Sequence, residues 1–511
     1  MKETNIQMNK MILLINIIII IISMISTPDL IIVYLFYLIF AILIYKYFTF
    51  NTKRYLYFTT LFYASVTSGN SKFVFLFYFL YIIVYLYNLY KHKSRRSFNK
   101  GYSKRYLIFF IIFVVYLFMS IFIAEDKYLA VKTLYRYVIM IALFALMFME
   151  NNSKDKLKET MRFFLILYAG ILFLGTLEIF NVNIGLENIY INSGITYEYT
   201  KRIPVTFFYN PNNYAVVLNL GIAMLFTHSL HLKKIKEKFF IYILISISIV
   251  NLIFTRSRLG WLTVFLTLLI VFIGGLILTF KNKNIGKTYM ISSVVTTIWI
   301  LFIFVALSLP NFMYPYYGKF ADSLIINNVK KEIFKVPIND TPETVPPIKL
   351  EYGGEGSENE RITLILNVLE GVIGEKRYLG FGVGNIGKYV EGKGNTNGLV
   401  NIHSSWFEYL GDFGIGMFIY LILMYCMMLW DTFIITLKTV NDDWFIPTML
   451  LVVGIIMVVL AFSPSTILMF TPFWTILGIC FSFVYNWKNE EFIVLREGMN
   501  FIEKNTNDCS K

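Results

Sequence analysis

The sequence predicts an all-α polytopic integral membrane protein. Of its 511 residues, 57% are hydrophobic and 15% are charged, and its mean hydropathy is +0.63; soluble domains carry about 25% charged residues. Apolar runs of roughly 20 residues, the length of a membrane-crossing helix, recur along the chain. Runs such as 16–25 and 106–123 are apolar on every face, whereas barrel strands would alternate. This composition excludes a soluble enzyme with a single core.

The apolar runs predict about fourteen spans, with twelve as the lower alternative. They lie near 11–26, 30–45, 55–68, 73–90, 106–123, 128–149, 161–180, 205–228, 239–255, 259–280, 288–309, 405–430, 444–462 and 466–486. The run at 55–68 is short and polar, and 128–149 carries Lys132 and Arg136 one helical turn apart. The first run is interpreted as a retained helix because Thr27-Pro28-Asp29 is no signal-peptidase site.

The positions of Lys and Arg predict the orientation of these spans. With the amino terminus inside, the cytoplasmic segments hold the basic blocks 91–105 and 233–238, while each short outer turn holds few basic residues. The net charge of +14 then needs no nucleic-acid partner. The predicted organisation is eleven spans over 1–309, a large extracytoplasmic loop over 310–402, three spans over 403–486 and a cytoplasmic tail over 487–511.

The loop 310–402 is the only sizeable soluble segment that this topology allows. Its first half is rich in Pro and Gly and is expected to be irregular. Its second half begins with a capping-box pattern at Ser357 and Glu360. Apolar residues then fall at helical spacing and predict an amphipathic helix on the membrane surface, closed by Gly374: Ile362, Ile365, Leu369 and Val372. The turn Gly380-Phe-Gly-Val-Gly384 lacks the preceding strand of a dinucleotide-binding loop.

His403 is the first candidate catalytic residue. It is the only histidine that the topology places on the outer side, directly before a span. A neutral imidazole accepts a proton near physiological pH, so His403 is a candidate general base. The alternative is a helix-start residue bonded to the loop backbone.

Several cations are candidates for binding an anionic lipid headgroup. Arg256 and Arg258 lie in a short turn between two apolar runs, and arginine forks pair with phosphate oxygens. The alternative is that they anchor the spans at the interface. Arg361, Lys132 and Arg136 complete the set of candidate cations.

Amides and carboxylates supply the remaining polar candidates. The amides of Asn210, Asn212 and Asn213 are candidates for binding sugar hydroxyls, with a capped turn around Pro211 as the alternative. Glu408, with Asp412, follows His403 and is expected to orient neighbouring groups or to act on the substrate. The three cysteines have no metal-ligand spacing and the loop has no Asp-x-Asp pair, so neither a metal nor a cofactor is predicted.

In this order, the motifs resemble the O-antigen ligase and polysaccharide polymerase family of bacterial envelope proteins. Four signatures between 204 and 424 carry the resemblance: Asn210-Pro-Asn-Asn-Tyr-Ala215, Ser257-Arg258-x-x-x-Leu262, Arg361 with the later Gly380-Phe-Gly-Val-Gly384, and the segment from His403-Ser-Ser-Trp-Phe-Glu408 to Gly416. The family commonly has His-Asn where this chain has His403-Ser404. The first 200 residues match only as generic spans.

The resemblance implies a GT-C-like, inverting, metal-independent glycosyltransferase at the outer face of the bacterial cytoplasmic membrane. Its donor would be a glycan on undecaprenyl diphosphate and its acceptor a glycan or glycolipid. His403 would activate the acceptor hydroxyl, and Arg256 or Arg258 with Arg361 would hold the diphosphate. A flippase and a chain-length regulator are the implied protein partners.

A polymerase of lipid-linked repeat units is the leading hypothesis, and a ligase, which shares donor and mechanism, is its close rival. A third hypothesis is a flippase for the same lipid-linked sugars. It predicts that Lys132 and Arg136 line a path open to both faces and that His403 is dispensable.

Overall fold

The computed structural model describes residues 2–48, 51–66, 72–92, 104–189, 202–308, 352–353, 357–396, 398–439, 445–463 and 470–487. Within these residues every regular element is a helix and there is no strand. The predicted all-α class is therefore confirmed. The first half of the predicted loop and the predicted tail beyond Trp487 lie outside the described residues.

Most of the described helices form one bundle. Its members are α1 (Lys2–Ser26), α2 (Ile31–Tyr47), α3 (Thr52–Val66), α4 (Lys72–His92), α5 (Lys104–Ile123), α6 (Lys127–Glu150), α7 (Lys154–Ile179), α9 (Pro211–His231), α10 (Ile235–Thr255), α11 (Arg258–Thr279), α12 (Lys283–Ser308), α17 (Ser405–Thr439), α18 (Ile446–Leu460) and α19 (Thr471–Asn486). Two short 3-10 turns join them, η1 (Pro28–Leu30) and η3 (Thr206–Phe208).

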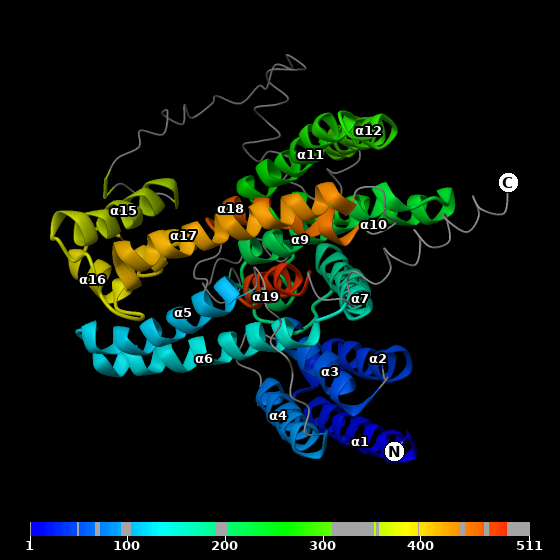
Figure 1. The fold of residues 1–511 in the computed structure, drawn as a ribbon, viewed down its shortest axis with the longest axis horizontal. Helices are drawn as coiled ribbons and strands as arrows, with labels where there is room; N and C mark the ends of the chain where they lie inside the picture. The colour runs from blue at the N-terminus through cyan, green and yellow to red at the C-terminus, as the bar shows by residue number, and fades with distance from the viewer. Residues whose placement is uncertain are drawn as a thin grey trace, which may run out of the picture.

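A small helical cap covers one end of this bundle. It consists of α15 (Ser357–Leu369), a π-helical turn (Glu370–Gly374) and α16 (Ile386–Lys393). In Figure 1 the cap lies at the left, beside the start of α17 and the turn between α5 and α6. We call this end of the bundle the cap end.

Ten described helices are long and apolar enough to cross a membrane. They are α1, η1 with α2, α5, α6, α7, α9, α10, α11, α12 and α17. The segment 76–87 of α4 and the helix α18 are apolar but shorter. Within the described residues the chain is thus a polytopic membrane protein, as predicted.

Two predicted spans differ in detail from the helices observed. The run at 55–68 corresponds to α3, which has 15 residues, nearly all buried, and packs against α2, α4 and α6. Its buried Arg54 donates to the carbonyl oxygens of Glu150, at 3.1 Å, and Lys156, at 2.7 Å. The polarity of this run therefore serves contacts inside the protein.

The run predicted to begin at 205 becomes α-helical only at Pro211, after the 3-10 turn η3. The Asn210 side chain accepts the N–H of Asn212 at 2.8 Å and caps α9. Proline is favoured at the first helical position, because its missing N–H would have no partner there. Pro211 thus begins the regular backbone of α9.

The predicted amphipathic helix exists, but its apolar face lies against protein. Its buried residues Leu364 and Val368 form a cluster with Val372, Phe381, Ile386, Val390, Ile402 and Leu410. α15 therefore packs its buried face on α16 and α17, so protein covers this face. Ile362, Ile365 and Leu369 are only half-buried, so the buried stripe is also displaced from the predicted one.

Candidate active site

The glycine-rich turn 380–384 fastens the cap to α17. All three of its glycines have positive φ, between 73° and 83°. A Cβ atom on Gly380 would lie 2.6 Å from the carbonyl oxygen of Asp412, and one on Gly384 would lie 2.3 Å from the hydroxyl of Thr133. Only glycine permits both this backbone conformation and this approach. The turn therefore packs closely between α6 and α17.

The Asp412 carboxylate completes this attachment. It is 2% exposed and accepts the N–H of Gly384 at 2.7 Å and that of Ile386 at 3.1 Å. The backbone carbonyl of Asp412 accepts the N–H of Gly382 at 3.0 Å. Because both carboxyl oxygens of this buried side chain accept backbone donors, Asp412 orients α16 relative to the first turns of α17. Of the two roles that the sequence left open for Asp412, to orient neighbouring groups or to act on the substrate, these contacts favour the first.

His403 lies immediately before α17, in an unusual conformation. Its φ is +53°, in the left-handed region that few non-glycine residues adopt. Its Nδ1 atom is buried and has no hydrogen-bond partner among the described residues. Strain of this kind gathers at functional sites, where the surrounding structure maintains it. The backbone bond from the Ser405 N–H to the Ala461 carbonyl, 2.8 Å, fixes the start of α17.

Arg361 from α15 lies close enough to His403 to affect its titration. Burial, and then the Arg361 guanidinium, lower the pKa of His403 to about 4. The imidazole is therefore neutral at physiological pH and can accept a proton. The structure thus brings together two of the predicted site residues, which are far apart in the sequence.

The segment after α18 contacts both the start of α9 and the start of α17, next to His403. The Ser463 hydroxyl donates to the Asn212 carbonyl at 3.3 Å, and Ala461 binds the start of α17. The Asn213 amide donates to the Phe208 carbonyl at 3.4 Å, while its Oδ1 atom is buried with no partner among the described residues. Asn210 serves as a helix cap, the alternative that its sequence allowed.

Arg256 lies in the turn between α10 and α11, and Arg258 is the first residue of α11. Arg256 ends α10 with φ +59°, and Ser257 caps α11 by accepting the Gly260 N–H at 3.3 Å. Both arginine side chains are exposed. A Cβ atom on Gly260 would lie 3.4 Å from the Ala215 Cβ, so this turn sits against the first turns of α9. The positive end of the α11 dipole adds to the two charges.

The remaining predicted site residues are Lys132, Arg136 and Glu408. Lys132 and Arg136 are exposed on α6 and form no ion pair with any described residue. Glu408 is half-buried in the first turn of α17 and acts electrostatically on Tyr137 of α6. Their roles in substrate binding stay predictions.

Glu178 is a site residue that sequence reasoning missed. It is 8% exposed at the end of α7, and its Oε2 atom accepts the N–H groups of Val205 and Thr206, both at 2.9 Å. Thr206 and Tyr209 have positive φ values, 47° and 61°. Glu178 therefore holds a strained segment that leads directly into Asn210. In the sequence, only its position as a single carboxylate at the end of an apolar run could have indicated a special role for Glu178.

Buried polar atoms that lack a partner gather around these motifs. Buried polar groups are nearly always hydrogen-bonded, so each exception needs a reason. Among the described residues, six such atoms belong to the segments above: Thr206 Oγ1, Asn213 Oδ1, Asn219 Oδ1, His403 Nδ1, Ser404 Oγ and Ser405 Oγ. This concentration is expected where a polar ligand supplies the missing partners. In the part of the chain that the structure describes, no group of three or more His, Cys, Asp or Glu side chains could hold a metal ion.

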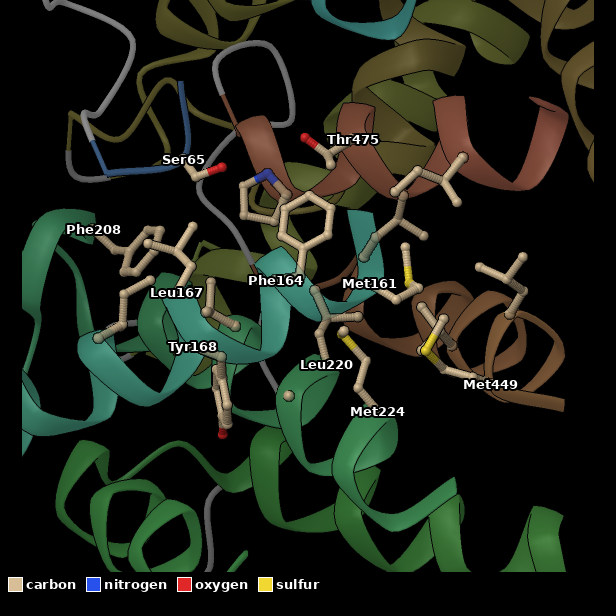
Figure 2. Close-up of a pocket in the computed structure, with 18 residues that line it drawn as sticks. Ser65, Met161, Phe164, Leu167, Tyr168, Phe208, Leu220, Met224, Met449 and Thr475 are labelled. Carbon is tan, nitrogen blue, oxygen red and sulfur yellow. The ribbon is translucent and has the colours of Figure 1, made fainter. Parts of the chain in front are cut away.

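An apolar cavity lies within the bundle beside this region. Side chains from four helices converge on it: Phe164 and Leu167 from α7, Leu220 and Met224 from α9, Met449 from α18 and Thr475 from α19 (Figure 2). Phe208, two residues before Asn210, also lines it. The cavity therefore connects the membrane-spanning part of the bundle with the start of α9.

These features define an all-α polytopic membrane protein with a polar site next to an apolar cavity. Residues 243–422, about a third of the chain, match the family model described as O-antigen ligase. This match supports the assignment to an O-antigen ligase or polymerase family that the sequence motifs suggested. The matched region contains Arg256, Arg258, Arg361 and His403, whereas Asn210 to Asn213 precede it. No curated protein and no solved structure matches the chain.

The family and the membrane helices together support a membrane protein of O-antigen ligase or polymerase type. A function of this type implies lipid-linked glycans as substrates and a membrane as the working environment.

Proposed function

We propose that the protein is an inverting, metal-independent glycosyltransferase that polymerises undecaprenyl-diphosphate-linked oligosaccharide repeats into cell-surface polysaccharide. In this proposal the cap end faces the outside of the bacterial cytoplasmic membrane. The observation that carries it is the neutral, half-buried His403 within the electrostatic reach of Arg361, among polar atoms that lack partners in the described residues. Glycosyl transfer from a diphosphate requires a base and a cation within one site.

The proposed reaction assigns one task to each of these groups. His403 takes the proton of an acceptor hydroxyl, and the hydroxyl oxygen attacks the anomeric carbon of the donor. The bond from that carbon to the diphosphate oxygen breaks, and its electron pair leaves with the diphosphate. Arg361, with Arg256 or Arg258, stabilises the charge that develops on the leaving group. Attack from the opposite side inverts the anomeric configuration.

The apolar cavity supports an amphipathic donor. Its lining is almost entirely hydrocarbon, and Phe208 places one side of it next to the start of α9. A polyprenyl tail in this cavity would hold its diphosphate near the polar groups of that segment. Apolar contacts along the tail would then supply binding energy at a distance from the reacting atoms.

A ligase is the second candidate, because the matching family model is described as O-antigen ligase. A ligase would transfer the glycan to a glycolipid or protein hydroxyl by the same chemistry. A flippase for the same lipid-linked sugars is the third candidate, and in it His403 would be dispensable.

Purified protein in detergent is expected to convert undecaprenyl-diphosphate-linked repeat units from its own organism into a ladder of longer glycans. The ladder is expected with chelator present, because no metal takes part in the proposed step. Products are resolved by size. An intact donor without a ladder would contradict the polymerase, and added glycolipid acceptors would then separate a ligase from a transporter.

Activity is expected to persist well below the ordinary histidine pKa of about 6.5. A protonated imidazole cannot act as a base, so kcat/KM falls as pH decreases through the pKa of His403, which is about 4. In Arg361→Gln the loss of the neighbouring charge raises this pKa, although burial still keeps it below 6.5. Initial rates measured from about pH 3.5 to pH 8 test this, because this range includes the expected fall. A fall in wild-type activity centred at pH 6.5 or above would contradict it.

A further inference from the structure

A hollow lies between the cap and the turn that joins α5 to α6. It has a volume of about 420 Å³, within the range of small-molecule sites. Glu125 lines it from the α5–α6 turn, Glu375 from the end of the π-helical turn, and Lys388, Tyr389 and Gly392 from α16. The hollow is therefore formed by three chain segments that only the tertiary structure brings together.

The charged groups around this hollow are paired. Lys388 binds Asp126 at 3.0 Å, and Arg377 binds Glu125. Lys393 binds both Glu370, at 3.0 Å, and Glu375, at 3.1 Å. Three cations and four carboxylates surround the hollow, and each of them already takes part in one of these ion pairs. Because these charges satisfy one another, the hollow suits an uncharged, polar ligand.

The carboxylate of Glu375 is held in a fixed orientation. The Tyr389 hydroxyl donates to its Oε1 atom at 2.6 Å, and this bond, followed by the one from Lys393, lowers the pKa of Glu375. The carboxylate therefore stays ionised and presents acceptors in a defined direction. Ligand hydroxyl groups could donate to its remaining lone pairs.

Two aromatic rings form the apolar part of the lining of the hollow. The rings of Phe381 and Tyr389 lie 4.3 Å apart between centroids, tilted by 34°. A Cβ atom on Gly371 would lie 2.7 Å from both rings, so the absence of a side chain there allows this packing. Fixed carboxylates beside an aromatic ring match a sugar, which carries adjacent hydroxyls on an otherwise apolar ring.

We propose that this hollow is a saccharide-binding subsite, which holds a sugar of the glycan away from the reacting bond. The inference rests on the proposed function, since it assigns this site to the same lipid-linked glycan. α16 is joined to the start of α17 through Asp412, so the subsite is rigidly placed relative to His403. Sugar bound there would align the glycan and contribute to KM more than to kcat.

Gly392 provides the test. It lines the hollow on α16, and a Cβ atom built on it meets nothing within 4 Å. Gly392→Phe is therefore expected to fill the hollow while leaving the packing of α16 intact. Gly374→Phe is the matched control, because Gly374 is exposed in the cap and its Cβ would meet only the Glu370 side chain, at 3.7 Å. Gly392→Ala, a smaller change, guards against a folding defect in Gly392→Phe.

The probe is the free repeat-unit oligosaccharide, released from the organism's own surface polysaccharide and carrying no lipid. Its Kd for the purified full chain in detergent is measured by equilibrium dialysis. We expect Gly392→Phe to weaken binding at least tenfold, Gly392→Ala to weaken it less, and both Gly374→Phe and His403→Ala to bind like the wild type. Excess inorganic diphosphate is expected to leave this binding unchanged.

Absence of binding to the wild type, equal binding by Gly392→Phe, or displacement by diphosphate would each overturn the subsite. These outcomes are separate from failure of the proposed function. That failure would appear as full-length product from His403→Ala, whatever the oligosaccharide affinity.

Discussion

Replacing His403 with alanine is expected to abolish long glycan products and to lower kcat by about 10²- to 10⁴-fold, the usual contribution of a general base. The half-buried imidazole is neutral, and its Nδ1 atom is buried with no partner among the described residues. Without it, the acceptor hydroxyl would have to attack while still protonated. Product length on gels and initial rates with the lipid-linked donor measure the effect.

Two further variants separate the loss of the base from a change in fold. His403→Gly also removes the imidazole, but it suits the observed φ of +53°. His228→Ala is the matched control, because the Nδ1 atom of His228 is likewise buried without a described partner, but His228 lies near the far end of α9. We expect His403→Gly to be inactive and His228→Ala to be active. Wild-type product from folded His403→Ala would exclude the catalytic role.

Replacing Arg258 with alanine is expected to lower kcat/KM by about 10²- to 10³-fold, as does the loss of one group that stabilises transition-state charge. Arg258 is exposed at the first position of α11, where the helix dipole also favours an anion. Arg258→Lys should recover only part of the activity, because an ammonium group cannot form the bidentate pair of a guanidinium with a phosphate. Steady-state rates over a range of donor concentrations measure both variants.

Arg256→Gly tests which of the two arginines carries this role. Glycine tolerates the left-handed conformation at position 256, so the variant removes the side chain without straining the turn. Lys234→Ala is the control, since Lys234 precedes α10 at the end opposite Arg256 and is 79% exposed. If Arg258→Ala retained kcat/KM within threefold of the wild type, the proposed contact with the diphosphate would be excluded.

The fold class and most of the helices were predictable from the sequence. The runs 106–123 and 259–280 correspond closely to α5, Lys104–Ile123, and α11, Arg258–Thr279. A membrane-crossing helix satisfies its own backbone, and its length is fixed by the bilayer, so local composition is enough to find it. The motif residues were also visible, because they interrupt or border these apolar runs: Arg256, Arg258, Arg361 and His403.

Local composition could not predict how α3 and α15 pack. The polar run of α3 is surrounded by other helices, and the apolar face of α15 is covered by α16 and α17. In both cases the partners come from distant parts of the chain. Periodicity shows that a helix has an apolar face, but it does not show whether lipid or protein covers that face.

The sequence by itself determined that this chain is a helical membrane protein and which polar residues are unusual within it. Only the tertiary structure decided that Arg361 acts on His403, that Asp412 fastens the cap to α17, and that Glu178 holds the segment before Asn210. The physical reason is that helix formation depends on neighbours within a few residues. Burial, charge and hydrogen bonding at a site depend instead on groups that folding brings together from distant segments.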